Sequence, residues 1–149
     1  QGLIIKVSRL YTNSLEDEQD LFQEIVLQLW RSYDSFKGQS KISTWMYRVA
    51  LNTAITLFRK KTKSPQTDEL MDFHHSGYME DDDEKQQQVS LLYKVIKMLP
   101  QVERAIVMMY LDDLPYRDIS ENLGITEVNA RVKMNRLKKT LKELMEKHA

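Results

Sequence analysis

The spacing of apolar side chains constrains this fold more than any other feature of the sequence. Across residues 21–33, and again across 42–57, apolar residues recur three and four positions apart, the repeat that gathers side chains on one face of an α-helix. Four glycines and three prolines leave few positions for the tight turns that join paired strands. The pattern therefore predicts an all-α protein.

Composition excludes several classes of protein. The chain contains no cysteine, which excludes disulfides, zinc–thiolate sites, iron–sulfur clusters and thiol nucleophiles. No apolar run approaches the roughly 20 residues that a membrane helix needs, and the apolar patch at residues 3–5 lacks the small-residue cleavage site of a signal peptide. We therefore expect a cytoplasmic protein that does not insert into a membrane.

Charge divides the chain into three blocks although the formal net charge is zero. Residues 1–61 carry nine basic and six acidic side chains, residues 62–87 carry two and eight, and residues 88–149 carry eleven and eight. The helical repeat stops in the middle block. We predict two small helical domains, 1–61 and 88–149, joined by a flexible acidic linker, 62–87. The basic flanking blocks keep nucleic acid open as a partner.

The linker allows one sharper interpretation, a metal site formed by His74, His75 and the neighbouring aspartates. Adjacent histidines in a loop fit a ligand pair poorly, and the sequence offers no evident partners to orient them. We therefore expect neither a metal nor a cofactor.

The amino-terminal block predicts three helices. Ser14 and Asp17 resemble a capping box at the start of the helix that carries the 21–33 stripe. A shorter stripe at residues 3–11 precedes it, and a third helix runs from Ile42 to the basic residues 59–61, where cations favour the carboxyl end of a helix.

The polar face of that third helix permits two interpretations. Thr44, Arg48 and Asn52 lie along one side, with the aromatic rings of Trp45 and Tyr47 beside them. Cations that follow phosphates and rings that stack on unpaired bases suit single-stranded nucleic acid. The alternative is an ordinary exposed face with Trp45 in the core.

The carboxy-terminal block carries a more specific pattern. Residues 115–123 form a short helix that Pro115 begins, Gly124 supplies a left-handed cap, and Thr126 caps a basic helix that extends to about residue 147. A short helix, a glycine turn and a basic helix predict a helix-turn-helix, whose second helix enters the major groove of DNA. Another kind of helical bundle is the alternative.

Side chains of this second helix divide by their expected contacts. Those near its amino end are placed to reach base edges: Glu127, Val128, Asn129, Arg131, Val132 and Lys133. Those further along are placed to meet phosphates: Arg136, Lys138 and Lys139.

Three segments together resemble bacterial sigma factors of the extracytoplasmic-function (ECF) group. Residues 20–31 look like the polymerase-binding stretch of region 2, residues 42–52 look like its promoter-melting helix, and residues 99–144 look like region 4. The chain opens inside what would be the first helices of region 2, so we expect an amino-terminally truncated region 2.

The resemblance implies a non-enzymatic initiation factor that works with core RNA polymerase and promoter DNA. An anti-sigma factor, free or anchored in the membrane, is a further implied partner. The implied polymerase-binding residues are Asp20, Gln23, Glu24 and Trp30. The implied −10 element-binding residues are Phe36, Lys41, Ser43, Thr44, Trp45, Arg48 and Asn52. The implied −35 element-binding residues are Arg117, Thr126, Glu127, Asn129, Arg131, Lys133 and Arg136.

The sequence departs from the family pattern at two positions of the second helix. Val128 and Val132 stand where the family often has small residues, so the resemblance implies no base contact for these two side chains.

One rival function is that of a helix-turn-helix regulator whose amino-terminal domain senses a ligand or partner. The other is an enzyme, but the three histidines lie in the linker and the tail, which leaves no positioned base and nucleophile.

Overall fold

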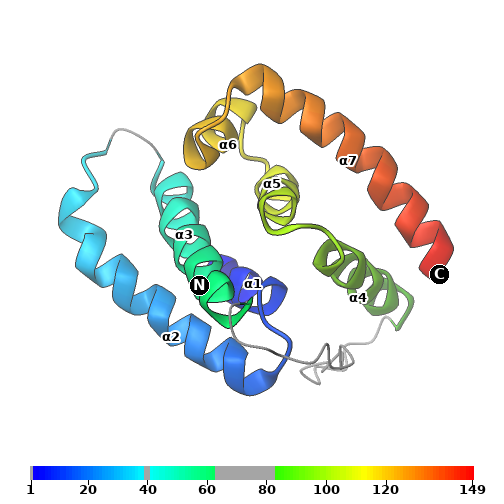
Figure 1. Cartoon of the computed structure of the whole chain (residues 1–149), viewed down its shortest axis with the longest axis horizontal. Helices are drawn as coiled ribbons and strands as arrows, with labels where there is room; N and C mark the ends of the chain where they lie inside the picture. The colour runs from blue at the N-terminus through cyan, green and yellow to red at the C-terminus, as the bar shows by residue number, and fades with distance from the viewer. Residues whose placement is uncertain (1, 39–40, 63–82) are drawn as a thin grey trace. The chain divides into compact units, whose positions relative to one another are not determined.

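A computed structural model describes residues 2–38, 41–62 and 83–149 of the chain (Figure 1). Among these residues every regular element is a helix, so the all-α prediction is confirmed. The helices divide into two compact units, an amino-terminal unit of α1–α3 and a carboxy-terminal unit of α4–α7, as the two-domain interpretation predicted. His74, His75 and most of the expected linker lie outside the described residues.

The amino-terminal unit contains three helices and one short turn of 3-10 helix. The elements are α1 (Gly2–Leu10), α2 (Leu15–Ser32), η1 (Tyr33–Ser35) and α3 (Ile42–Thr62). Each of the three α-helices contacts the other two. Their buried side chains include Val7, Leu21, Ile25, Tyr47, Ala50 and Ala54.

The start of α2 follows from its capping residue. Ser14 has extended backbone angles, and its hydroxyl accepts a hydrogen bond of 3.1 Å from the backbone N–H of Asp17. The side chains of Glu16, Asp17 and Glu18 place negative charge in the first turn, where the helix dipole favours it. The predicted cap at Ser14 is thus confirmed.

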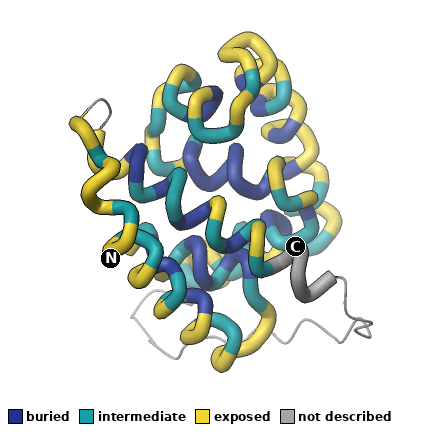
Figure 2. Tube along the Cα trace, turned by 60° about the vertical axis from the view of Figure 1, so that its left-hand side comes forward, coloured by how far each residue is buried: buried dark blue, intermediate teal, exposed yellow. Residues whose placement is uncertain are grey.

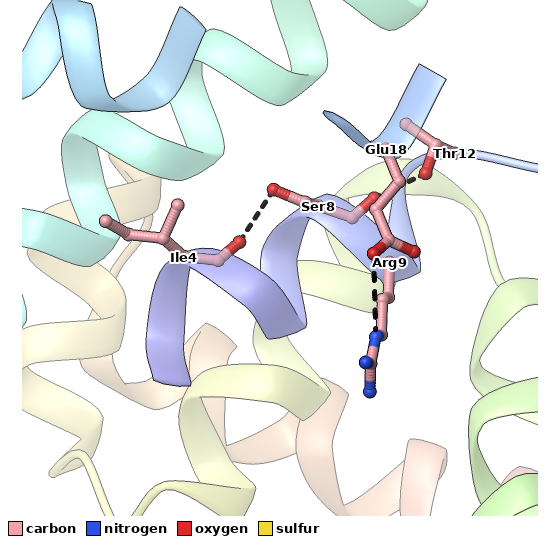
Figure 3. A network of polar contacts seen from close by, with 5 residues as sticks. All are labelled: Ile4, Ser8, Arg9, Thr12 and Glu18. Carbon is pink, nitrogen blue, oxygen red and sulfur yellow. Dashed lines mark hydrogen bonds and ion pairs between the residues drawn. The ribbon is translucent and has the colours of Figure 1, made fainter. Parts of the chain in front are cut away.

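Polar contacts lie within α1 and between α1 and the start of α2 (Figure 3). Within the first helix and the turn that follows it, the buried Ser8 hydroxyl donates to the Ile4 carbonyl at 2.7 Å, and the Thr12 hydroxyl donates to the Ser8 carbonyl at 2.6 Å. Between the helices, Arg9 Nε lies 3.7 Å from Glu18 Oε2. Both side chains of this ion pair are partly exposed to water, so the pair contributes little to stability.

The carboxy-terminal unit contains α4 (Asp83–Lys97), α5 (Gln101–Leu111), α6 (Tyr116–Leu123) and α7 (Glu127–His148). The long α7 packs against the other three helices. Buried and exposed positions alternate along the helices in the tube of Figure 2, as amphipathic helices require.

Helix α4 begins inside the segment that was expected to be a linker. The expected linker ended at residue 87, whereas the helix starts at Asp83. Acidic residues at the start of a helix are favoured by its dipole, and the apolar stripe that follows gives the helix a face to bury. The linker prediction included the first turn of α4 because residues 83–87 are charged or polar and show no apolar repeat.

One buried cation was not expected from the sequence. Arg104 of α5 is 8% exposed, and its Nη2 donates to the backbone carbonyls of Lys97 at 2.8 Å and Leu99 at 3.1 Å. A cation at the carboxyl end of a helix satisfies carbonyls that have no partner within the helix. Arg104 therefore fixes the end of α4 against α5.

Candidate nucleic-acid interface

The turn between α6 and α7 is built by two residues. Gly124 ends α6 in the left-handed region, with φ of 68° and ψ of 31°. The Thr126 hydroxyl accepts a hydrogen bond of 3.1 Å from the backbone N–H of Asn129 and so caps α7. The predicted caps at Gly124 and Thr126 are confirmed. Pro115 was expected to begin α6, but it precedes the helix as its N-cap residue. This connection has the short turn that a helix-turn-helix needs.

The two sides of α7 differ in chemistry. Its buried residues Ala130, Met134, Leu137 and Leu141 are three or four positions apart and face the unit's core. Val128 and Val132 are 66% and 40% exposed. Each lies about 160° around the helix from Ala130. The side of α7 that is free to enter a groove therefore has apolar side chains at its centre.

The side chains predicted to bind the −35 element lie at or near the surface. Exposed are Arg117, Thr126, Glu127, Asn129, Arg131 and Arg136, and half-buried is Lys133. Two of the arginines form ion pairs one helical turn apart: Arg131 Nη2 lies 3.7 Å from Glu127 Oε1, and Arg117 Nε lies 3.6 Å from Glu121 Oε1. Their contacts with DNA stay predictions.

A row of aromatic and cationic side chains crosses from α7 to α5, and sequence analysis missed it. The Arg131 guanidinium lies 5.2 Å from the centre of the Tyr116 ring, and the Tyr116 and Tyr110 rings lie 6.1 Å apart. Lys138 Nζ lies 4.8 Å from the centre of the Tyr110 ring. The side-chain hydrogen bond with Tyr110 raises the pKa of Lys138. The only sequence signal was the seven-residue spacing of the two cations.

The residues predicted to bind the −10 element divide into exposed and buried groups. Exposed are Lys41, Ser43 and Asn52, and half-buried are Phe36 and Arg48. Thr44 and Trp45 are buried, with exposures of 1% and 9%. The structure places these two side chains in the core of the unit, as the alternative interpretation held for Trp45. A role in binding DNA stays a prediction for all seven.

Trp45 belongs to an aromatic cluster. Its ring centre lies 5.1 Å from that of Phe36, in a tilted arrangement, and 6.5 Å from that of Tyr33, in an edge-to-face arrangement. Such geometries are the favoured ones for aromatic pairs. The cluster therefore connects the start of α3 to η1 and the residue that follows it.

The predicted polymerase-binding residues share an accessible side of α2. Asp20 and Gln23 are exposed, and Trp30 is 82% exposed. Glu24 is half-buried, and its Oε1 accepts a hydrogen bond of 3.0 Å from Gln28 Nε2. A large exposed aromatic ring beside acidic and amide groups suits a protein partner.

Two features are absent from the part of the chain that the structure describes. It contains no group of three or more histidine or acidic side chains that could hold a metal ion. None of its helices combines the length and the apolarity needed to span a bilayer.

Two models of known protein families together match most of the chain. The family model for sigma-70 region 2 matches residues 1–64, and the model for sigma-70 region 4 matches residues 90–141. These segments contain the predicted polymerase-binding side of α2, the aromatic cluster and the helix-turn-helix.

Curated relatives agree with these family models. The ECF RNA polymerase sigma factor SigG of Mycobacterium tuberculosis is 41% identical over 54 residues, which are 36% of this chain but 15% of that protein. The ECF RNA polymerase sigma-E factor of Haemophilus influenzae is 28% identical over 130 residues, 78% of this chain and 69% of the relative. RNA polymerase sigma factor SigZ of Bacillus subtilis is 27% identical over 85% of this chain and 72% of the relative.

Solved structures share the fold. The sigma factor RpoE of Bartonella quintana, in complex with the anti-sigma factor NepR, superposes with a TM-score of 0.70 at 18% identity, covering 97% of this chain and 90% of that one. CnrH in complex with the cytosolic domain of CnrY gives a TM-score of 0.68 at 15% identity, covering 99% and 83%.

Proposed function

The chain belongs to the ECF group of the sigma-70 family, whose members direct RNA polymerase to promoters, and from this membership we propose that it is a promoter-specificity subunit. It is a DNA-binding initiation factor and not an enzyme. Its partners in this role are core RNA polymerase and promoter DNA.

The observation that carries this proposal is the helix-turn-helix of α6 and α7. A glycine turn and a threonine cap set the start of α7, and cationic side chains surround its exposed side. A helix of this kind fits the major groove of a duplex. The carboxy-terminal unit therefore reads the −35 element as double-stranded DNA.

The amino-terminal unit has the complementary task in this proposal. The exposed side of α2, with Trp30, Asp20 and Gln23, docks on core polymerase. The exposed side chains of Lys41, Ser43 and Asn52 then bind the opened −10 element, where cations and polar groups follow a single strand.

An anti-sigma factor is the proposed regulatory partner, supported by the complex in which the similar RpoE structure was solved. We place the protein in the cytoplasm, because polymerase and promoter DNA are found there.

Binding-site selection tests the proposal. The full chain, alone and together with core RNA polymerase, is incubated with a randomised DNA library, and the retained sequences are determined. We expect two spaced elements to be enriched with polymerase present. Enrichment of the same single element with and without polymerase would instead favour the helix-turn-helix regulator.

A further inference from the structure

Two tyrosines and two cations form a continuous row across three helices of the carboxy-terminal unit. Tyr110 lies in the last turn of α5 and Tyr116 begins α6. Arg131 and Lys138 lie seven residues apart on α7, so they share one side of the helix. The contacts run from Arg131 to Tyr116 at 5.2 Å, from Tyr116 to Tyr110 at 6.1 Å, and from Tyr110 to Lys138 at 4.8 Å.

Arg131 is held from two directions. The face of the Tyr116 ring attracts its guanidinium, and the Glu127 carboxylate lies 3.7 Å from its Nη2. An exposed arginine otherwise samples many rotamers and must lose that freedom when it binds. A side chain that is already ordered loses less, so its contact with a ligand is tighter and more directional.

Lys138 is held in a comparable way at the other end of the row. Its amine lies over the Tyr110 ring, and the hydrogen bond between the two side chains raises the pKa of Lys138. A lysine amine is charged at neutral pH at its ordinary pKa, so the Tyr110 ring holds a cation at this end of the row.

We propose that Tyr116 and Tyr110 are positioning residues for DNA recognition, Tyr116 by orienting Arg131 toward a base edge and Tyr110 by orienting Lys138 toward a phosphate. This inference rests on the proposed reading of the −35 element by α6 and α7. It assigns different consequences to the two rings, because base contacts set sequence preference whereas phosphate contacts strengthen binding to every sequence.

The test compares four variants of the full chain, with and without core polymerase, in selection from a randomised duplex library. Tyr116→Leu should weaken the preference at one or two base pairs by about two- to fivefold, the size of an exposed cation–π contact. Tyr110→Leu should lower affinity for all sequences alike and leave the preferred sequence unchanged. Tyr116→Phe and Tyr110→Phe retain the rings, so Tyr116→Phe should keep the preference and Tyr110→Phe most of the affinity.

A double-mutant comparison separates positioning from a general structural effect. If Tyr116 acts through Arg131, Tyr116→Leu should change nothing further in an Arg131→Ala background. The inference is overturned if Tyr116→Leu retains the wild-type preference, if its effect persists fully without Arg131, or if Tyr110→Leu changes the preferred sequence.

NMR of the unbound wild-type chain tests the contact itself. The Tyr116 ring should shift the Arg131 Hε resonance upfield, and Tyr116→Phe should retain that shift. An unshifted resonance would overturn the inference even where a −35 sequence is selected. A wild-type chain that selects no sequence with or without polymerase would instead contradict the proposed function, whatever the resonance shows.

Discussion

Two valines lie at the centre of the exposed side of α7. Val128 and Val132 are exposed on the side of α7 opposite its buried stripe, where the family pattern carries no base contact to them. In the major groove the apolar group available to such side chains is the C5-methyl of thymine. At the scale of single residues, these valines are therefore the side chains most suited to read thymine.

This assignment predicts the effect of removing one methyl group. Replacing thymine by uracil within the selected −35 duplex should weaken binding by about two- to tenfold at one or two positions, since a buried methyl is worth about 0.8 kcal/mol or somewhat more. A Val132→Ala variant should lose sensitivity to that replacement, whereas Lys139→Ala should keep it. Equal affinity for both duplexes at every position would rule out the thymine assignment.

At the scale of elements, Gly124 determines whether α6 and α7 meet at the correct angle. Its φ of 68° is unfavourable for residues with a side chain, although a Cβ would meet nothing within 4 Å. Gly124→Ala should therefore lower the free energy of unfolding by about 1–2 kcal/mol through backbone strain alone.

Thermal unfolding of matched variants checks this cost. Gly2→Ala is the control, because Gly2 lies in a helix and also has no atoms within 4 Å of an added Cβ. It should leave the melting temperature unchanged or raise it slightly. Gly124→Asn should lose less than Gly124→Ala, since asparagine tolerates the left-handed region. Equal melting temperatures for Gly124→Ala and wild type would contradict the strain argument.

The accessible side of α2 predicts a second effect at this scale. Reversing the charge in Glu24→Lys should weaken association with core polymerase by about tenfold, because a like or unmatched charge at a protein interface is costly. Asp34→Lys is the control in the same unit, since Asp34 is exposed in η1 and outside the predicted face. Pull-down with purified core polymerase measures the binding of each variant, and circular dichroism checks that each is folded. Equal binding by the two variants would contradict the placement of Glu24 at the polymerase interface.

Sequence pattern predicted the helices and their caps better than it predicted which side chains contact one another. Apolar spacing and the residues Ser14, Gly124 and Thr126 carry local information, and the structure confirms the helices and caps that they imply. The ring contacts of Trp45 with Tyr33 and Phe36 join α3 to η1 and the residue after it, and local spacing within one helix does not predict them.

The spacing of residues in the sequence did not predict the contacts between separate helices. The buried Arg104 donates to backbone carbonyls at the end of α4 and just beyond it, and side-chain spacing cannot predict such partners. The row of Tyr110, Tyr116, Arg131 and Lys138 likewise requires three helices to pack before its members meet.

At the scale of the whole molecule, the acidic segment between the units predicts a dependence on salt. Residues 62–87 carry two basic and eight acidic side chains, in contrast to the basic blocks on either side. Neutralising Asp81, Asp82 and Asp83 to asparagine should raise the affinity of the free protein for DNA severalfold at low salt, because negative charge near the units disfavours phosphates. The gain in affinity should shrink as the salt concentration rises. A variant that binds DNA as tightly as the wild type does at every salt concentration would show that these three aspartates do not weaken DNA binding.

The central claim is that this chain confers promoter specificity on RNA polymerase through two elements. Run-off transcription by core polymerase tests it most directly, on one selected promoter and on templates in which either the −35 or the −10 element is scrambled. The account predicts a transcript with a defined start only when the full chain is present, and its loss when either element is scrambled. The same transcript from core polymerase alone, or one that survives scrambling of both elements, would contradict the account.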